Sequence, residues 1–416
     1  MHENTPPALR WDLFCRVVDN FGDLGVCWRL ACDLHRQGQR VRLWVDDPGL
    51  AARMTHPRPG LELVPWTDPP PPLQPLDVVV EAFGCDPPDT FVEAMAAMAA
   101  MPAMATTANP ADAPAELHSA HRASPPVWIN LEYLTAETYA QRSHGLPSPQ
   151  LSGAGQGLSK WFFYPGFHPA TGGLIREADL AARQRAFDRD AWLSQWGPWE
   201  PDRPFGPRRE RVVSLFAYPS APLERLLDDW ARAPEPTWLL VAWGELQARA
   251  AAWLRDRPEA SAWLRITPLP WLSQEDFDHL LWSCDLNFVR GEDSLVRAIW
   301  AGKPFVWQLY PQTDGAHEAK LAAFLHAAPG LEGLVGLQAA WRAWCGLAPW
   351  PGDNAPRAAA SPSFAQGDPA LQAAWGACVQ RWAAVLAERP SLTTRLIDFA
   401  VDKLGGKAAA QDRIEG

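Results

Sequence analysis

The sequence predicts an α/β protein built from two successive Rossmann-like domains, and three observations lead to this fold class. The chain has 416 residues, which is too long for one ordinary hydrophobic core. Short apolar runs of strand type alternate with amphipathic helical runs over residues 13–195, and the alternation begins again over residues 212–344. A segment rich in proline and arginine, residues 197–209, separates the two alternating regions and is predicted to be a linker.

Domain boundaries follow from these changes in pattern. In chain order we predict an N-terminal Rossmann-like domain, a linker, a C-terminal Rossmann-like domain, closing helices split by Pro390, and a frayed tail, at residues 1–196, 197–209, 210–380, 381–404 and 405–416. Two segments without apolar periodicity, residues 96–126 and 349–369, are predicted to be insertions.

Composition and charge exclude several classes of protein. The chain is 47% hydrophobic and 20% charged, which is typical of globular proteins. Its formal charge is −11 and its basic runs are no longer than Arg208-Arg209, so we expect no nucleic-acid partner. Uninterrupted apolar runs stay short of the ~18 residues of a membrane span, so we also expect no membrane association.

Cysteine usage and the N-terminus point to the cytoplasm. The seven cysteines are scattered and form no CxxC pair, which indicates neither a zinc site nor a disulfide framework. The first residues, MHENTPPALRWD, lack the basic and apolar regions of a signal peptide. We therefore expect a cytoplasmic protein with reduced thiols and without a metal or other cofactor.

The stretch from Ser283 to Gln312 organises the second domain. Its pattern predicts a strand over Cys284–Val289, a charged loop over Arg290–Ser294, and a helix that Gly302 ends. In a parallel sheet such a loop lies at the carboxyl edge, where ligands bind, and the following helix offers its N–H groups to phosphate. Capping of that helix is an alternative role for Asp293 or Ser294, but it does not explain Glu292. The loop therefore predicts a charged sugar-nucleotide site.

The first βα turn carries two aspartates. A strand at residues 13–18 and a helix at residues 26–37 flank the turn, whose Gly22-x-x-Gly25 spacing is not the dinucleotide fingerprint. Asp19 could fix the turn and Asp23 could cap the helix. We nevertheless expect a catalytic role for at least one of the two, because both lie at the carboxyl edge of the predicted sheet.

Three further segments are assigned from pattern alone. Residues 144–149 and 161–167, which are rich in proline and aromatic side chains, are predicted to be loops, with His144 as a structural loop histidine. Residues 176–195 are predicted to form one helix.

Two doubly wound domains with a phosphate-binding loop in the second are typical of GT-B glycosyltransferases. More specific blocks run through the chain in the order FCRVVDNFGDLGVCWRLA, VEAFGC, INLEYLTAE, HGLPSP, FFYPGF, TGGLIRE, SLFAY and CDLNFVRGEDSLVRAIWAGKPFVWQLYPQ. These blocks resemble the signature blocks of the EarP family, the protein-arginine rhamnosyltransferases that modify bacterial translation elongation factor P.

The resemblance implies both a fold and a reaction. It implies a GT-B fold with two Rossmann-like domains facing across a cleft. It implies an inverting enzyme that moves L-rhamnose from dTDP-β-L-rhamnose to an arginine side chain of elongation factor P, without a metal. It further implies that the modified factor becomes active in rescuing ribosomes stalled at polyproline.

The resemblance also implies roles for individual residues. Asp23 matches the general base, Asp19 and Asn20 fall in the sugar and acceptor region, and Glu292 matches a second essential carboxylate. The positions that match nucleotide-binding residues are Phe216, Tyr218, Trp271, Leu272 and Gln274, and those that match the diphosphate loop are Arg290, Asp293 and Ser294. Tryptophan at position 271 departs from the phenylalanine expected there but keeps an apolar ring for the base.

Elementary chemistry agrees with an acidic acceptor site. An arginine side chain has a pKa above ~12, so its nitrogen lone pair is a poor nucleophile unless carboxylates orient the group and accept a proton. Two alternatives remain open from the sequence. One is a GT-B enzyme with another sugar nucleotide or a small-molecule acceptor, and the other is a nucleotide-sugar-binding protein without catalysis.

Overall fold

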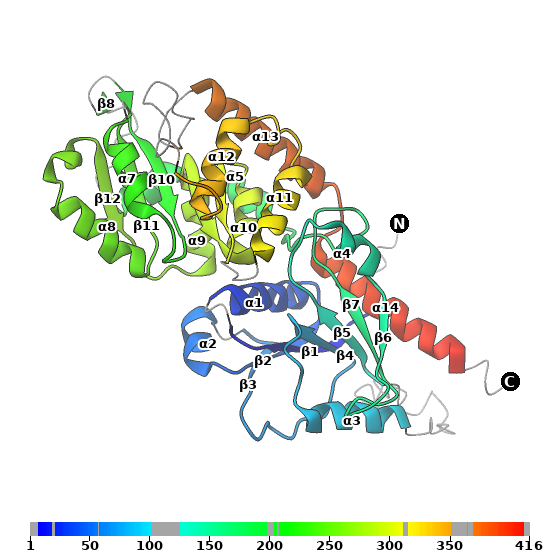
Figure 1. Ribbon diagram of the computed structural model, residues 1–416. Coiled ribbons are helices and arrows are strands. Elements are labelled where there is room, and N and C mark those ends of the chain that lie inside the picture. The colour runs from blue at the N-terminus through cyan, green and yellow to red at the C-terminus, as the bar shows by residue number, and fades with distance from the viewer. Residues whose placement is uncertain are drawn as a thin grey trace. The chain divides into compact units, whose positions relative to one another are not determined.

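The protein forms two compact units, described here from a computed structural model (Figure 1). The structure describes residues 7–18, 21–56, 58–100, 125–197, 204–205, 208–233, 235–310, 315–350, 364 and 369–411. Unit 1 comprises residues 1–134, 138–176 and 390–416, and unit 2 comprises residues 135–137 and 177–389. Two α/β units confirm the predicted fold class at this level.

Unit 1 is built on a seven-stranded sheet with the order β3-β2-β1-β4-β5-β7-β6. Its strands are β1 (Arg10–Cys15), β2 (Arg40–Val45), β3 (Leu61–Pro65), β4 (Val78–Ala82), β5 (Val127–Leu131), β6 (Pro147–Pro149) and β7 (Ser159–Phe163). All neighbouring pairs are parallel except β6 with β7. The first five strands thus have the 3-2-1-4-5 order of a doubly wound Rossmann-like sheet, whose switch point lies between β1 and β4.

The helices of unit 1 include one from the far end of the chain. They are α1 (Phe21–Arg36), α2 (Pro48–Met54), α3 (Asp89–Ala100), α4 (Thr138–Ser143) and α14 (Leu392–Gln411). Figure 1 shows α14, in red, alongside β7, where Phe399 packs edge-on against Trp161 and Phe163. The Leu392 N–H also donates to the Leu174 carbonyl over 2.9 Å. The C-terminal helix is therefore part of the N-terminal unit.

Unit 2 repeats the same winding in a five-stranded, fully parallel sheet of order β12-β11-β10-β13-β14. Its strands are β10 (Arg211–Leu215), β11 (Thr237–Val241), β12 (Leu264–Pro268), β13 (Leu286–Arg290) and β14 (Phe305–Gln308). Counted within the unit, the order is again 3-2-1-4-5, with the switch point between β10 and β13. A short antiparallel pair, β8 (Pro204–Phe205) with β9 (Arg208–Arg209), precedes the sheet.

Helices account for most of the remaining described part of unit 2. They are α5 (Leu180–Ala186), α6 (Arg189–Ser194), α7 (Leu223–Ala231), α8 (Glu245–Arg255), the 3₁₀ helix η2 (Pro258–Ala262), α9 (Gln274–Ser283), α10 (Gly291–Ala301), α11 (Ala316–Ala327), α12 (Val335–Trp344) and α13 (Pro369–Ala387).

Large aromatic side chains fill both cores. In unit 1 the Phe14 ring stacks on Trp44 at 4.9 Å between centroids and meets Phe91 edge-on at 4.9 Å. In unit 2 Trp238 packs with residues of β10, α6 and α9. These rings therefore pack the strands of each sheet against the helices that cover it.

Several predicted elements differ from the structure. The predicted loops at residues 144–149 and 161–167 contribute β6 and β7, because an antiparallel edge strand accepts proline that a central strand would not. The single helix predicted at residues 176–195 is two helices, since Asp188 starts α6 by accepting the Ala191 N–H over 3.0 Å.

The structure also differs from the predictions made for the C-terminal helices and for the insertions. Helix α14 continues to Gln411, so most of the predicted tail is helical, and α13 and α14 belong to different units rather than to one closing pair. Of the insertions predicted at residues 96–126 and 349–369, residues 96–100 form the end of α3, and residues 101–124 and 351–368, apart from Phe364, lie outside the described residues. Among the described residues, no helix has the length and apolarity needed to cross a membrane.

Candidate functional site

The switch point of unit 2 brings together three of the predicted nucleotide-site residues. Phe216 and Tyr218 follow β10, and Arg290 ends the adjacent strand β13. The guanidinium carbon of Arg290 lies 4.6 Å from each of the two ring centroids. An Arg290 Nη1 hydrogen also points to the Ala217 carbonyl, 3.4 Å away. Cation–π attraction thus fixes a positive charge at the carboxyl edge of the sheet.

A residue that the sequence did not single out supports this arrangement. Gln308, the last residue of β14, is 2% exposed, and its Oε1 accepts the Tyr218 N–H over 2.7 Å. Its Nε2 lies 3.4 Å from the Ser220 hydroxyl. A polar residue at the carboxyl end of an otherwise apolar strand was the available signal in the sequence. Gln308 therefore holds the loop that carries Tyr218.

The predicted charged loop is in fact the first turn of a helix. Gly291, with φ +66°, begins α10 directly after β13, so Glu292, Asp293 and Ser294 are helical. The alternative that Asp293 or Ser294 caps this helix is wrong, because the N-cap position is Arg290. The buried Ser294 hydroxyl instead accepts the Arg290 N–H over 3.1 Å and donates to the Arg290 carbonyl.

The helix start explains why this turn suits phosphate. First-turn N–H groups have no acceptor within their own helix, and the helix dipole adds partial positive charge at the same end. N–H groups of this kind, together with the positive charge of Arg290, can bind an anion at a switch point.

Glu292 is paired with a lysine from another helix. Its Oε1 lies 3.0 Å from Lys320 Nζ on α11, and both side chains are largely buried. Lys320 was missed in the sequence because it lies 28 residues away on a helix without a recognisable motif. The pair fixes the position of the Glu292 carboxylate beside the start of α10.

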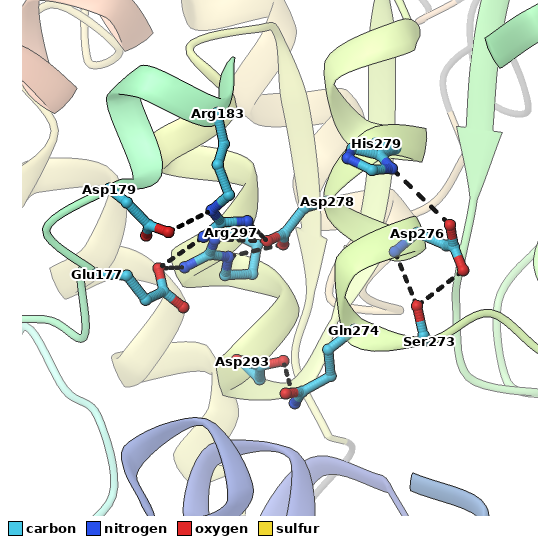
Figure 2. Close-up of polar contacts among 10 residues, drawn as sticks. All are labelled: Glu177, Asp179, Arg183, Ser273, Gln274, Asp276, Asp278, His279, Asp293 and Arg297. Atoms are coloured by element: carbon cyan, nitrogen blue, oxygen red, sulfur yellow. Dashed lines mark hydrogen bonds and ion pairs between the residues drawn. The ribbon is translucent and has the colours of Figure 1, made fainter. Parts of the chain in front are cut away.

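The predicted base-binding residues lie on the segment that leads into α9. Ser273 caps α9 by accepting the Asp276 N–H over 3.0 Å, and the following Gln274 donates to Asp293 Oδ2 over 3.4 Å (Figure 2). The Trp271 ring meets the half-exposed Trp243 edge-on at 5.5 Å. Leu272 packs against the core cluster around Trp238 and Leu240.

Asp23 lies in unit 1 at the carboxyl end of β1. Helix α1 begins at Phe21 rather than at the predicted position 26, so Asp23 is inside its first turn. The side chain is 4% exposed, and its Oδ2 accepts the Val18 N–H over 2.8 Å. The alternative that Asp23 is the N-cap of this helix is therefore wrong. Asp19 and Asn20 lie outside the described residues.

Other buried ionisable groups of unit 1 have structural partners. Burial raises the pKa of Asp12, which binds Arg42, and of Glu81, which binds Lys160. Burial, with the charge of Arg395, lowers the pKa of His144 to about 4, and its Nδ1 accepts the Tyr164 N–H over 3.0 Å. Within the described residues, no cluster of three or more His, Cys, Asp or Glu side chains could hold a metal ion.

Comparison with known proteins identifies the family. Residues 11–401 match the family model described as elongation factor P (EF-P) rhamnosyltransferase EarP. A protein-arginine rhamnosyltransferase of Pseudomonas aeruginosa is 40% identical over 95% of this chain and 99% of its own length. One of Pseudomonas putida is 42% identical over 80% of this chain and 86% of its own length.

A solved structure agrees with the sequence relatives. That structure gives the structural basis for EarP-mediated arginine glycosylation of translation elongation factor EF-P. It aligns with this protein with a TM-score of 0.54 and 28% identity, over 95% of this chain and 99% of that one. The fold is therefore that of a GT-B glycosyltransferase. The chain belongs to the EarP family, and it is an enzyme, a protein-arginine rhamnosyltransferase.

Proposed function

We propose that this enzyme transfers L-rhamnose from dTDP-β-L-rhamnose to one arginine side chain of elongation factor P, with inversion at the anomeric carbon. One observation carries the donor half of the proposal. Arg290, stacked on Phe216 and Tyr218, lies beside the N-terminus of α10 at the switch point of unit 2. The solved relative, which acts in arginine glycosylation of EF-P, supports the acceptor half.

The donor contacts follow from charge and shape. The diphosphate would bind the first-turn N–H groups of α10 together with Arg290 and Ser294, which gain importance as negative charge grows on the leaving group. Phe216 and Trp271 would offer apolar surface to the thymine, beside Leu272 and Gln274. Tyr218 and Asp293 complete the predicted donor set, in which no metal takes part.

The acceptor contacts require carboxylates. A guanidinium is protonated at neutral pH, so a carboxylate must orient it and another must take its proton as the new bond forms. We assign proton acceptance to Asp23 and orientation to Glu292, with Asp19 and Asn20 as further acceptor-side residues. Lys320 keeps Glu292 in place.

Transfer proceeds as a single displacement at the anomeric carbon. A guanidinium nitrogen attacks the anomeric carbon of rhamnose from the face opposite the phosphate. A carbon–nitrogen bond forms, the bond from carbon to phosphate oxygen breaks, and dTDP leaves with that electron pair. The nitrogen loses one proton, which Asp23 accepts, and the β-linked donor gives an α-linked product.

The cellular setting is part of the proposal. We infer that the enzyme acts in the cytoplasm on folded elongation factor P, and that the modified factor relieves ribosomes stalled at polyproline. These inferences rest on the family resemblance and on the described chain having no membrane-spanning helix.

Calorimetry with nucleotides tests the donor assignment. The wild-type enzyme is expected to bind dTDP more tightly than UDP, and Ser294→Ala and Tyr218→Phe are each expected to weaken dTDP binding. Anomeric coupling in the NMR spectrum of the product distinguishes the expected α linkage from retention. Equal affinity for dTDP and UDP, or a β-linked product, would contradict the respective part of the proposal.

A further inference from the structure

A buried ion network lies one helical turn along α10 from the proposed donor site. Arg297 of α10 is 1% exposed and donates from Nε and Nη2 to the two carboxylate oxygens of Asp278 on α9, over 2.7 and 2.6 Å. Its Nη1 donates to Glu177 over 2.7 Å. Figure 2 shows that the three side chains converge from separate segments. We refer to Glu177, Asp278 and Arg297 as the buried network.

The buried network lies one helical turn from the Gln274–Asp293 contact along both helices. Gln274 and Asp278 are four residues apart on α9, and Asp293 and Arg297 are four residues apart on α10. Residues at this spacing lie on one face of a helix, so the Gln274–Asp293 and Asp278–Arg297 contacts are successive rungs between the same two helices (Figure 2). The two contacts therefore join the same pair of helix faces.

Two more charged residues surround the network. Arg183 of α5 lies 3.8 Å from Glu177 and 3.9 Å from Asp278, and Asp179 pairs with Arg183 over 3.3 Å at the surface. The two arginines and the two buried carboxylates balance in charge. Glu177 is also the residue at which the chain passes from unit 1 into unit 2. The network thus joins α9, α10 and the start of the chain segment that forms unit 2.

Burial of these charges is not explained by stability. Removing ions from water costs much of what their attraction returns, and well-packed apolar residues often hold such a position equally well. A bidentate arginine contact differs from apolar packing because it accepts only one relative placement of the two helices. Compared with apolar packing, the ionic contacts therefore add a requirement for one relative placement of α9 and α10.

We propose that Arg297 is a positioning residue for the donor site, which sets the register of α10 against α9 and so the placement of Asp293 and Gln274. This rests on the proposed function only in taking the start of α10 as the diphosphate site. Arg297 itself touches no substrate.

The first test compares two Arg→Lys variants. Arg297→Lys keeps the charge but cannot bind both oxygens of Asp278 and Glu177 together. Arg42→Lys is its matched control, since Arg42 binds Asp12 in the same bidentate way in unit 1, over 2.7 and 2.8 Å. Both variants are expected to lower Tm. Only Arg297→Lys is expected to weaken dTDP binding, by about tenfold or more, which is the effect of losing one hydrogen bond to a charged group.

A second variant separates geometry from stability. The triple replacement Glu177→Leu, Asp278→Leu and Arg297→Met is expected to fold with Tm near that of the wild type, yet to bind dTDP more weakly. Adding Asp293→Asn to Arg297→Lys is expected to weaken dTDP binding by less than the product of the two single effects, because both act through one rung.

Three results of these binding measurements separate failure of the positioning role from failure of the proposed donor. If Arg297→Lys and the apolar triple variant bind dTDP like the wild type, the network is structural only and the positioning role is overturned. If wild-type enzyme prefers UDP, the proposed donor is wrong, and the same comparison with UDP still decides the role of Arg297. If wild-type enzyme binds neither nucleotide, the proposed function and this inference both fail.

Discussion

At the scale of single residues, the proposed chemistry depends on how each charged side chain is held. Asp23 is nearly buried, and its Oδ2 accepts the Val18 backbone N–H. Glu292 is paired with Lys320, and Arg290 is stacked on two aromatic rings. Glu292 and Arg290 are thus fixed by neighbours outside their own sequence block, and Asp23 by a backbone group five residues before it. Substitutions that keep this neighbour contact separate chemistry from structure.

Asp23→Asn is the most informative single change in unit 1. Asparagine keeps an oxygen that can accept the Val18 N–H, so the fold and dTDP binding should survive. The proton acceptor is lost, so transfer should fall by at least ~10²-fold. Single-turnover transfer to elongation factor P, with calorimetry of dTDP binding, measures the two effects.

The matched control is Asp47→Asn. Asp47 also accepts a backbone N–H at a helix start in unit 1, from Leu50 over 2.8 Å, and asparagine caps about as well as aspartate. This control should transfer rhamnose like the wild type. Asp23→Asn with near-normal transfer would leave Asp23 a structural residue.

His144 is expected to make stability depend on pH. Its folded pKa of about 4 lies below the ordinary 6.5, so between these values the unfolded chain binds a proton that the folded chain does not. The stability that neutral His144 contributes is complete above pH 6.5 and decreases as pH falls toward 4. Relative to His144→Asn, which can still accept the Tyr164 N–H, the wild-type Tm should fall between about pH 7 and about pH 5. Parallel changes in both proteins would rule out this titration.

At the scale of elements, α10 connects fold and function. The sequence placed its end correctly at Gly302, which has φ +65° and lies at its C-cap. It did not place the beginning, because the charged residues at 290–294 are typical of a loop while Gly291 lets the helix start immediately after β13. The same error occurred at α1, whose first turn contains glycine and aspartate. In both cases the backbone begins a helix where side-chain propensity favours a turn.

Two Gly→Ala variants test the backbone conformation at the end of α10 and inside α14. Gly302→Ala should lower the free energy of unfolding by about 1–2 kcal/mol, because a Cβ disfavours the left-handed conformation. The added Cβ would meet no clash, since its nearest atom, in the Gln380 side chain, is 3.6 Å away. Gly405→Ala, inside α14, should stabilise by about 1 kcal/mol. Denaturant unfolding should therefore show opposite shifts, and shifts of the same sign would contradict these backbone assignments.

At the scale of the whole molecule, the sequence predicted the two α/β units because hydrophobic alternation records local structure. It did not predict that residues 390–411 pack on unit 1, since Leu392 and Phe399 reach partners over 200 residues away in sequence. Gln308, Lys320 and the buried network around Arg297 were missed for the same reason. Contacts between distant segments leave no periodic signal in a single sequence.

Metal dependence is a property of the whole reaction. In the proposed site, the N-terminus of α10 and Arg290 provide the positive charge that a divalent cation supplies in other glycosyl transfers. Transfer should therefore be the same with EDTA as with added magnesium, measured at saturating dTDP-rhamnose. Activity that is lost in EDTA and restored by magnesium would show that the diphosphate needs a metal.

The most direct test of the central claim is intact-mass measurement of elongation factor P after incubation with this enzyme and dTDP-β-L-rhamnose. The account predicts a gain of one rhamnosyl group per molecule, with no gain when the acceptor arginine is replaced by lysine. It also predicts no gain when UDP-glucose replaces the donor. An unchanged mass with active wild-type enzyme, or an equal gain on the lysine variant, would contradict the assignment of arginine rhamnosylation to this factor.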